Sequence, residues 1–153
     1  MTGTPRAIHD TVTVERHIAA SPKQVFLAWS DPESKQRWQP TPDGFDMVHH
    51  NFDFQNGGIE RLEMKQGEKT FAEFEQCYLD ISIDHRIIYT VKVFADGQLT
   101  SCSKEIIEFI PQDSGTLLCC TEQVTWFHGQ SMRSEHESGW ATLLDRLEKE
   151  VTT

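Results

Sequence analysis

The chain has 153 residues, of which 37% are hydrophobic and 25% charged, and it contains nine Phe and four Trp. This length suits a single domain that buries about 70% of its unfolded surface, and the aromatic content excludes a disordered chain. Lys and Arg number 14 against 24 Asp and Glu, which gives a formal net charge of −10. Such an acidic chain is excluded as a binder of the nucleic-acid phosphate backbone and as a polybasic membrane-surface protein.

The sequence has neither an apolar run of about 20 residues nor the apolar core of a secretory signal at its start. We therefore expect a cytoplasmic protein without a membrane span, in which the four cysteines are reduced thiols with structural roles. No C-x-x-C pair occurs. Cys119 and Cys120 are adjacent, so in a strand they point to opposite faces.

Near the start of the chain, apolar and polar residues alternate from Val12 to Ile18, which predicts a half-buried strand. Ser21, Pro22 and Gln24 then form the signature of a capping box with proline at the first helical position. This predicts a helix that ends near residue 30. The pattern Asp31-Pro32-Glu33 repeats the start signal and predicts a second short helix to about residue 38.

From residue 45 to 127 the pattern changes to strands separated by turns. Glycine-containing turns occur at 57–58, 66–68, 96–97 and 113–115, and the segment 87–94 is rich in β-branched and aromatic residues. Consecutive hairpins of this kind predict a six-stranded antiparallel meander.

The final segment, 131–151, predicts one amphipathic helix. Its apolar stripe is expected to contain Met132, His136, Trp140, Leu143, Leu147 and Val151. The predicted fold is therefore a single α+β domain over residues 1–153, in which a curved antiparallel sheet of about seven strands wraps around the long C-terminal helix and two short helices follow the first strand. Because one helix seldom fills such a curved sheet, we expect an internal pocket.

The chain resembles the START-like helix-grip superfamily (SRPBCC), in the branch homologous to activators of heat-shock-protein-90 ATPase. No single motif is specific, but their order and spacing together are. The matching segments are residues 15–22, 25–26, 29–33, 37–38, 53–58, 78–81, 86–90, 115–116, 121–123, 137–140 and 143–147. The resemblance implies the helix-grip fold and an apolar internal cavity. It does not imply one reaction, because members of the superfamily bind lipids, cyclise polyketides or assist chaperones.

Seven histidines raise the question of a metal centre. His49 and His50 diverge in a strand, and His128 and His136 have no acidic ligand at a recognisable spacing. Nucleophile-elbow, phosphate-loop and dinucleotide motifs are missing from the sequence. We therefore predict no metal and no cofactor.

His136 has two interpretations. It lies on the same predicted helix stripe as Trp140, where its ring could bind or protonate a ligand in a cavity. Alternatively, it is a histidine near a helix start that contacts solvent or a strand carbonyl.

Two carboxylates also have two interpretations. Glu105 shares a strand face with Ile107 and Phe109, and Glu122 shares one with Leu118 and Cys120. If these faces are buried, both acids project inward and could do general acid–base work. Alternatively, one or both lie near a strand end, hydrated or paired with Arg or Lys.

The favoured function is that of a module that binds a small apolar or amphipathic molecule between the long helix and the sheet; an enzyme of the polyketide-cyclase or hydrolase type, or a chaperone-cooperating protein, are the alternatives. The sequence leaves open whether the protein forms a homodimer.

Trp29 and Trp38 are expected to pack the small helices, and Gly139 is expected either at a cavity wall or at a close helix–sheet contact. The residues expected to bind the ligand are Tyr89, Glu105, Glu122, His136, Trp140 and Leu143.

Overall fold

The computed structural model describes residues 6–39 and 41–153, and it has the predicted α+β architecture with seven strands and three helices. The predicted bounds hold to within a few residues. The elements are β1 (Ile8–Ile18), α1 (Pro22–Ser30), α2 (Pro32–Trp38), β2 (Asp46–Phe52), β3 (Ile59–Gln66), β4 (Lys69–Ser82), β5 (Arg86–Ala95), β6 (Gln98–Gln112), β7 (Gly115–Trp126) and α3 (Arg133–Thr152).

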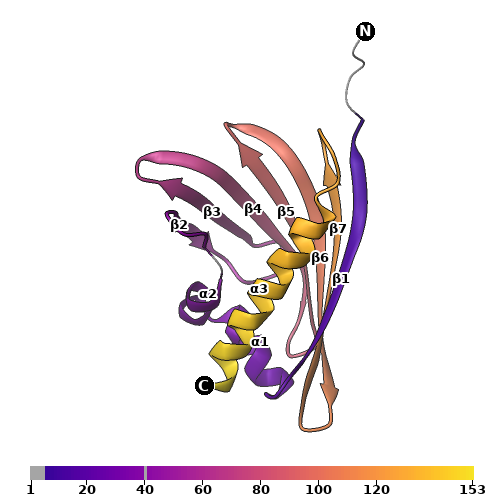
Figure 1. The fold of residues 1–153 in the computed structure, drawn as a ribbon. Coiled ribbons are helices and arrows are strands. Elements are labelled where there is room, and N and C mark those ends of the chain that lie inside the picture. Colours follow the sequence, from indigo (N-terminus) through magenta and orange to yellow (C-terminus); the bar gives the residue numbers. More distant parts are fainter. Residues whose placement is uncertain (1–5, 40) are drawn as a thin grey trace.

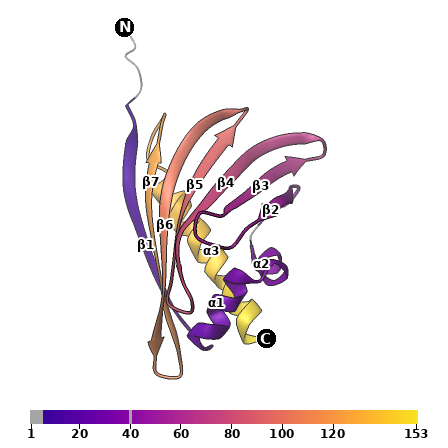
Figure 2. The ribbon, with the colours of Figure 1, turned by 180° about the vertical axis from the view of Figure 1, so that it is seen from behind.

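All seven strands form one antiparallel sheet in the order β1-β7-β6-β5-β4-β3-β2. The meander from β2 to β7 is closed at its far side by β1, which pairs with β7 over its whole length. The sheet curves around α3, which crosses its concave face, while α1 and α2 lie at the end of the sheet near the C-terminus (Figure 1; Figure 2 from behind). No helix in the described part of the chain is long and apolar enough to cross a membrane.

The two short helices begin as the sequence predicts. The Ser21 hydroxyl accepts from the Gln24 backbone N–H, and the Gln24 side chain accepts in return from the Ser21 backbone N–H. The Asp31 carboxylate accepts from the Glu33 backbone N–H at the start of α2. These caps satisfy backbone donors that have no partner inside the helix.

Aromatic side chains join the short helices to the sheet. Trp29 and Trp38 are both buried with their ring centroids 4.9 Å apart, and the Trp38 indole N–H donates to the Ala28 carbonyl. Phe26 packs edge-on against Phe109 of β6. The predicted packing role of both tryptophans is confirmed.

The helix α3 differs from the prediction at its start and in its stripe. It begins at Arg133 rather than 131, and Met132 is 45% exposed, so its inclusion in the apolar stripe was wrong. Leu144, which the predicted stripe omitted, is 1% exposed and packs in the core with Trp140 and Leu147. The buried side therefore follows spacings of four and three residues in a phase slightly rotated from the predicted one.

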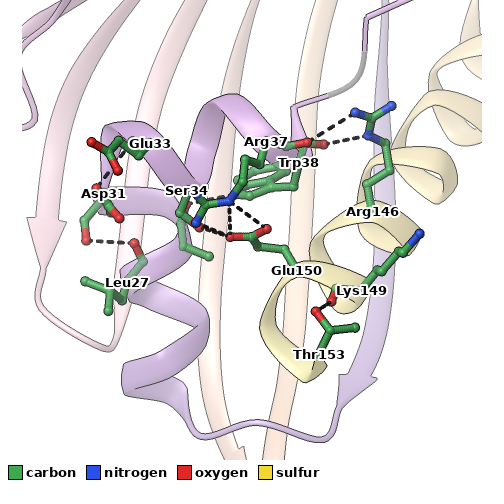
Figure 3. Close-up of polar contacts among 12 residues, drawn as sticks. Leu27, Asp31, Glu33, Ser34, Arg37, Trp38, Arg146, Lys149, Glu150 and Thr153 are labelled. Atoms are coloured by element: carbon green, nitrogen blue, oxygen red, sulfur yellow. Dashed lines mark hydrogen bonds and ion pairs between the residues drawn. The ribbon is translucent and has the colours of Figure 1, made fainter.

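The C-terminal half of α3 is fixed by polar contacts to α2 (Figure 3). The Arg37 guanidinium pairs with the Glu150 carboxylate at 2.7 Å, which also accepts from the Ser34 hydroxyl. Arg146 donates to the backbone carbonyls of Arg37 and Trp38. These contacts hold the C-terminal half of α3 against α2. The N-terminal half of α3 shares a cavity with residues of β5, β6 and β7.

The cysteines are four free thiols. Cys119 is partly exposed and Cys120 is buried in the core, so the adjacent pair points to opposite faces as predicted.

Candidate functional site

A row of four polar or aromatic side chains crosses the concave face of the sheet. Tyr78 of β4 pairs with Tyr89 of β5, Tyr89 with Glu105 of β6, and Glu105 with Glu122 of β7. Residues directly opposite one another in a ladder point to the same face, so the register itself brings these four groups together. Burial of all four identifies this face as the inner one.

The two glutamates therefore both project inward, and the alternative of hydrated residues at strand ends was wrong. Alternation along β6 places Glu105 with buried Ile107 and Phe109, and alternation along β7 places Glu122 with buried Leu118 and Cys120. The proposed acid–base role of Glu105 and Glu122 depended on these two strand faces being buried.

A cavity of about 320 Å³ lies between this row and the N-terminal half of α3. Its lining contains all six residues that the sequence singled out: Tyr89, Glu105, Glu122, His136, Trp140 and Leu143. Three further lining residues were missed, namely Gln76, Val91 and Glu135, while Gly139, for which a cavity wall was one of two expectations, also lines the cavity. Gln76 and Val91 could have been found from alternation, because each lies two residues from a tyrosine of the row. Glu135 is exposed and lines the cavity from α3, and the apolar stripe of the helix gave no signal for it.

Glu105 is the most buried of the three acids that line this cavity, with 3% of its surface exposed. Its Oε1 accepts from the Ser103 hydroxyl at 2.8 Å, whereas its Oε2 is buried without a hydrogen-bond partner among the described residues. Burial, together with the hydrogen bond and the charge of Glu122, raises the pKa of Glu105 well above its usual range. Burial beside the Glu122 carboxylate therefore favours the protonated form of Glu105.

Glu122 has the opposite tendency. Burial raises its pKa, but hydrogen bonds from His136 and Glu105 outweigh burial, and the pKa is lowered. The His136 Nδ1 lies 2.7 Å from Glu122 Oε1, and this hydrogen bond raises the pKa of His136 against the effect of burial. The histidine thus contacts a carboxylate on the cavity side, rather than a strand carbonyl. The three groups form a chain of acid, carboxylate and imidazole that can hold or move a proton.

Aromatic groups make up the apolar walls. Tyr89 and Trp140 are each 8% exposed, and burial raises the pKa of the Tyr89 hydroxyl well above its usual range. His136 contacts Trp126 edge-on, with ring centroids 5.3 Å apart. The Tyr89 phenol therefore lies beside the two carboxyl groups on the sheet, and the Trp140 indole lines the cavity from α3.

Gly139 lies on the cavity side of α3. A Cβ atom added there would meet no other atom within 4 Å. The structure therefore excludes the close helix–sheet contact and leaves the cavity-wall interpretation of this glycine.

A second buried polar cluster lies beside the row and was not predicted. The Lys35 ammonium of α2 lies 2.6 Å from Glu60 Oε1 of β3, and the Tyr78 hydroxyl donates to the same oxygen at 2.7 Å. Burial lowers the pKa of Lys35, although Glu60 opposes this effect, and burial raises the pKa of Tyr78. The ammonium also lies 5.1 Å from the centroid of the Phe52 ring. The sequence signal was alternation of Glu60 with buried Leu62, but nothing in the sequence pairs a strand glutamate with a helix lysine 25 positions away.

A larger cavity, of about 710 Å³, lies elsewhere and was also not predicted. It is bounded by α1, the loop between β2 and β3, and the turn between β4 and β5. Its apolar lining residues are Phe26, Leu27, Phe54, Ile81 and Ile83. Leu27 and Ile83 are 59% and 72% exposed, so this cavity opens widely to solvent.

Histidines 49 and 50 diverge as predicted. His49 is half-buried with a pKa lowered chiefly by burial, while the exposed His50 ring lies 2.8 Å from Glu63. Within residues 6–39 and 41–153, no three His, Cys, Asp or Glu side chains are grouped so that they could hold a metal ion.

Comparison with solved structures agrees with the overall fold. The chain is 32% identical to the Mll3558 protein from Rhizobium loti, with a TM-score of 0.83 over 94% of this chain and 98% of the other. An uncharacterised protein from Rhizobium leguminosarum is 30% identical, with a TM-score of 0.83 over 95% of each chain. Protein CV1439 from Chromobacterium violaceum, at 24% identity and a TM-score of 0.80 over 94% of this chain and 97% of the other, shares the fold.

The comparison with curated proteins gives no significant match. Residues 19–152 match the family model described as Activator of Hsp90 ATPase homolog 1-like protein, and this range covers both short helices, β2 to β7 and all of α3. The chain therefore belongs to the Activator of Hsp90 ATPase homolog 1-like family.

Proposed function

We propose that this protein binds a small amphipathic molecule in the cavity between α3 and the concave face of the sheet. The observation that carries the proposal is the convergence of buried carboxyl groups and aromatic walls on a cavity of about 320 Å³. Small-molecule sites have volumes of about 300–1,000 Å³, and a few placed polar groups in an otherwise apolar lining orient the ligand.

The polar groups are unusual for a packed interior. Glu105 Oε2 is buried, and no ordinary donor reaches it among the described residues. Its partner is the Glu122 carboxyl, and that hydrogen bond requires a proton held between two buried acids. A ligand that donates a hydrogen bond could take the place of this proton. Gly139 leaves open space on the cavity side of α3, which the ligand can occupy.

The larger cavity beside α1 is the competing location. Its charged lining residues, Lys23 and Asp84, are not buried, so it lacks a polar group held away from water. We therefore favour the smaller cavity, and the experiment below separates the two.

The test uses the neutral fluorophore N-phenyl-1-naphthylamine as the probe, because its emission rises in apolar surroundings. Saturable binding is expected, with a change in tryptophan fluorescence that Trp140→Phe largely removes. Gly139→Met places a long side chain in the cavity mouth and should abolish the binding. Ser138→Met adds the same side chain one position away, where the helix is exposed, and should leave binding unchanged.

Saturable binding that both methionine variants retain would contradict the proposed site. If Leu27→Asn then weakened it, the cavity beside α1 would be the true location. Binding that does not saturate would contradict a defined site in either cavity.

Acid–base catalysis in the same cavity is a second candidate, favoured by the chain of Glu105, Glu122 and His136. One acid holds its proton while the neighbouring carboxylate is ionised, which is the division of roles that general acid–base chemistry needs. Ligand binding is common to both candidates, so the fluorophore experiment comes first.

A further inference from the structure

The lining of the cavity between α3 and the sheet is acidic without a compensating lysine or arginine. Among the described residues, its charged or titratable side chains are Tyr89 on β5, Glu105 on β6, Glu122 on β7, and Glu135 and His136 on α3. Strand β4 adds Gln76, which does not titrate. His136 compensates the charge of Glu122 when its ring is protonated, so a negatively charged ligand is repelled by the exposed Glu135 and, at longer range, by the net charge of −10.

Glu105 Oε2 indicates which atom the ligand must present. Its companion Oε1 accepts from Ser103, and the Glu122 carboxyl opposite already accepts from His136 through Oε1. Oε2 is buried and has no donor among the side chains that the structure describes. Without a ligand, Glu105 and Glu122 can satisfy this oxygen only by sharing one proton between their carboxyl groups.

From this geometry, and resting on the proposed function, we propose that the ligand carries a basic nitrogen whose ammonium group binds between Glu105 and Glu122. An ammonium supplies up to three N–H donors and a charge that neutralises the carboxylate formed when the shared proton leaves. Tyr89 and Trp140 line the same cavity and can contact a cation through their ring faces. The apolar part of the ligand then lies against Val91 and Leu143.

The proton balance of this binding step is explicit. The O–H bond of the Glu105 carboxylic acid breaks, its proton passes to the buffer, and the resulting carboxylate accepts N–H bonds from the ammonium. No electrons are transferred and the ligand keeps all its protons. Binding of the amine is therefore coupled to release of up to one proton, whereas a neutral ligand of the same shape releases none.

The test compares 2-(1-naphthyl)ethylammonium with 2-(1-naphthyl)ethanol by isothermal titration calorimetry in buffers of different ionisation enthalpy. We expect the ammonium to bind about tenfold to one-hundredfold more tightly than the alcohol, as is usual for a charge-assisted hydrogen bond. We also expect proton release with the ammonium only. Glu105→Gln should remove both the higher affinity of the ammonium and the proton release, while binding of the alcohol persists.

Glu108→Gln is the matched control, because it removes the same charge from the outer face of the same strand. It should change neither affinity nor proton release. The proton count on the unaltered protein tests the proposal even if Glu105→Gln fails to fold. Equal affinities for the two probes, or ammonium binding without proton release, would overturn the proposal and leave the proposed function standing. If neither probe binds, both proposals fail.

Discussion

Glu105 and Glu122 face each other across the ladder between β6 and β7, and only one of the two is tied to a cationic partner. His136 fixes the charge on Glu122, and that charge together with burial keeps the proton on Glu105. Neighbouring carboxyls thus acquire different protonation states from their surroundings. This difference determines both the chemistry available in the cavity and the pH dependence of stability.

Glu105→Gln should stabilise the protein, and the gain should grow with pH. The folded-state pKa of Glu105 is raised above its usual value of 4.5, so its acid form stabilises the fold fully below that pH and the contribution is lost as pH rises toward the folded pKa. Glutamine imitates the protonated acid and has no such loss. Urea unfolding should give a gain of about 1–3 kcal/mol at pH 8 and much less at pH 4. An equal effect at both pH values would contradict the protonation assigned to Glu105.

His136→Gln should destabilise the protein most between pH 4.5 and 6.5. The raised pKa of His136 means that its stabilising effect is complete below 6.5 and is lost as pH rises through the folded pKa. The lowered pKa of Glu122 means that the stabilising effect of its carboxylate is present above pH 4.5. This effect is lost as the pH falls below 4.5 toward the folded-state pKa. Because the His136 side chain is 28% exposed, we expect a loss of only about 1 kcal/mol at pH 5.5.

The measurement is a series of urea titrations from pH 4 to 9, with His9→Gln as the control because His9 is exposed. A loss that is constant across this range would show that the ion pair with Glu122 does not form.

Lys35→Met should be among the most destabilising single substitutions. It leaves the Glu60 carboxylate buried and uncompensated, which costs about 3–5 kcal/mol, because Lys35 and Glu60 are 5% and 0% exposed. Adding Glu60→Gln should restore much of the loss, since no buried charge then remains. A double-mutant cycle by chemical unfolding checks this.

The exposed ion pair of Lys92 and Glu75, at 3.7 Å, provides the comparison. Lys92→Met should cost less than about 1 kcal/mol. Similar costs for the two lysine substitutions would mean that the cluster of Lys35, Glu60 and Tyr78 is open to water.

Gly139→Ala should raise the melting temperature and weaken ligand binding. Alanine gains about 0.5–1 kcal/mol over glycine inside a helix, and its methyl group enters open space on the cavity side. Differential scanning calorimetry and the fluorophore titration measure the two effects. Ser138→Ala changes the neighbouring exposed position and should leave affinity unaltered. A destabilised Gly139→Ala variant with unchanged affinity would refute the cavity-wall role.

The sheet and the cavity row were predictable because strands have a period of two. Once Ile107 and Leu118 were taken as buried, Glu105 and Glu122 had to share their faces. The helix α3 was harder, because several stripes at spacings of three and four overlap along it. Choosing Leu143 over Leu144 rotated the predicted face slightly, so that the predicted stripe wrongly included Met132 and gave no signal for Glu135.

Features that depend on how separate elements meet could not be read from the sequence. Lys35 reaches Glu60 because α2 lies against the edge of the sheet, and local periodicity carries no information on that approach. The larger cavity forms where α1, a loop and a turn come together around Leu27 and Ile83. Hydrophobic patterning predicts that such residues are apolar, but it does not predict the space left between them.

The most direct test of ligand binding between α3 and the sheet is a set of isotope-filtered nuclear Overhauser effects between bound N-phenyl-1-naphthylamine and methyl-labelled protein. Val91 and Leu143 line the proposed cavity, whereas Leu27 and Ile83 line the one beside α1. We predict contacts from the probe to the methyl groups of Val91 and Leu143. Contacts to Leu27 and Ile83 alone would contradict the account.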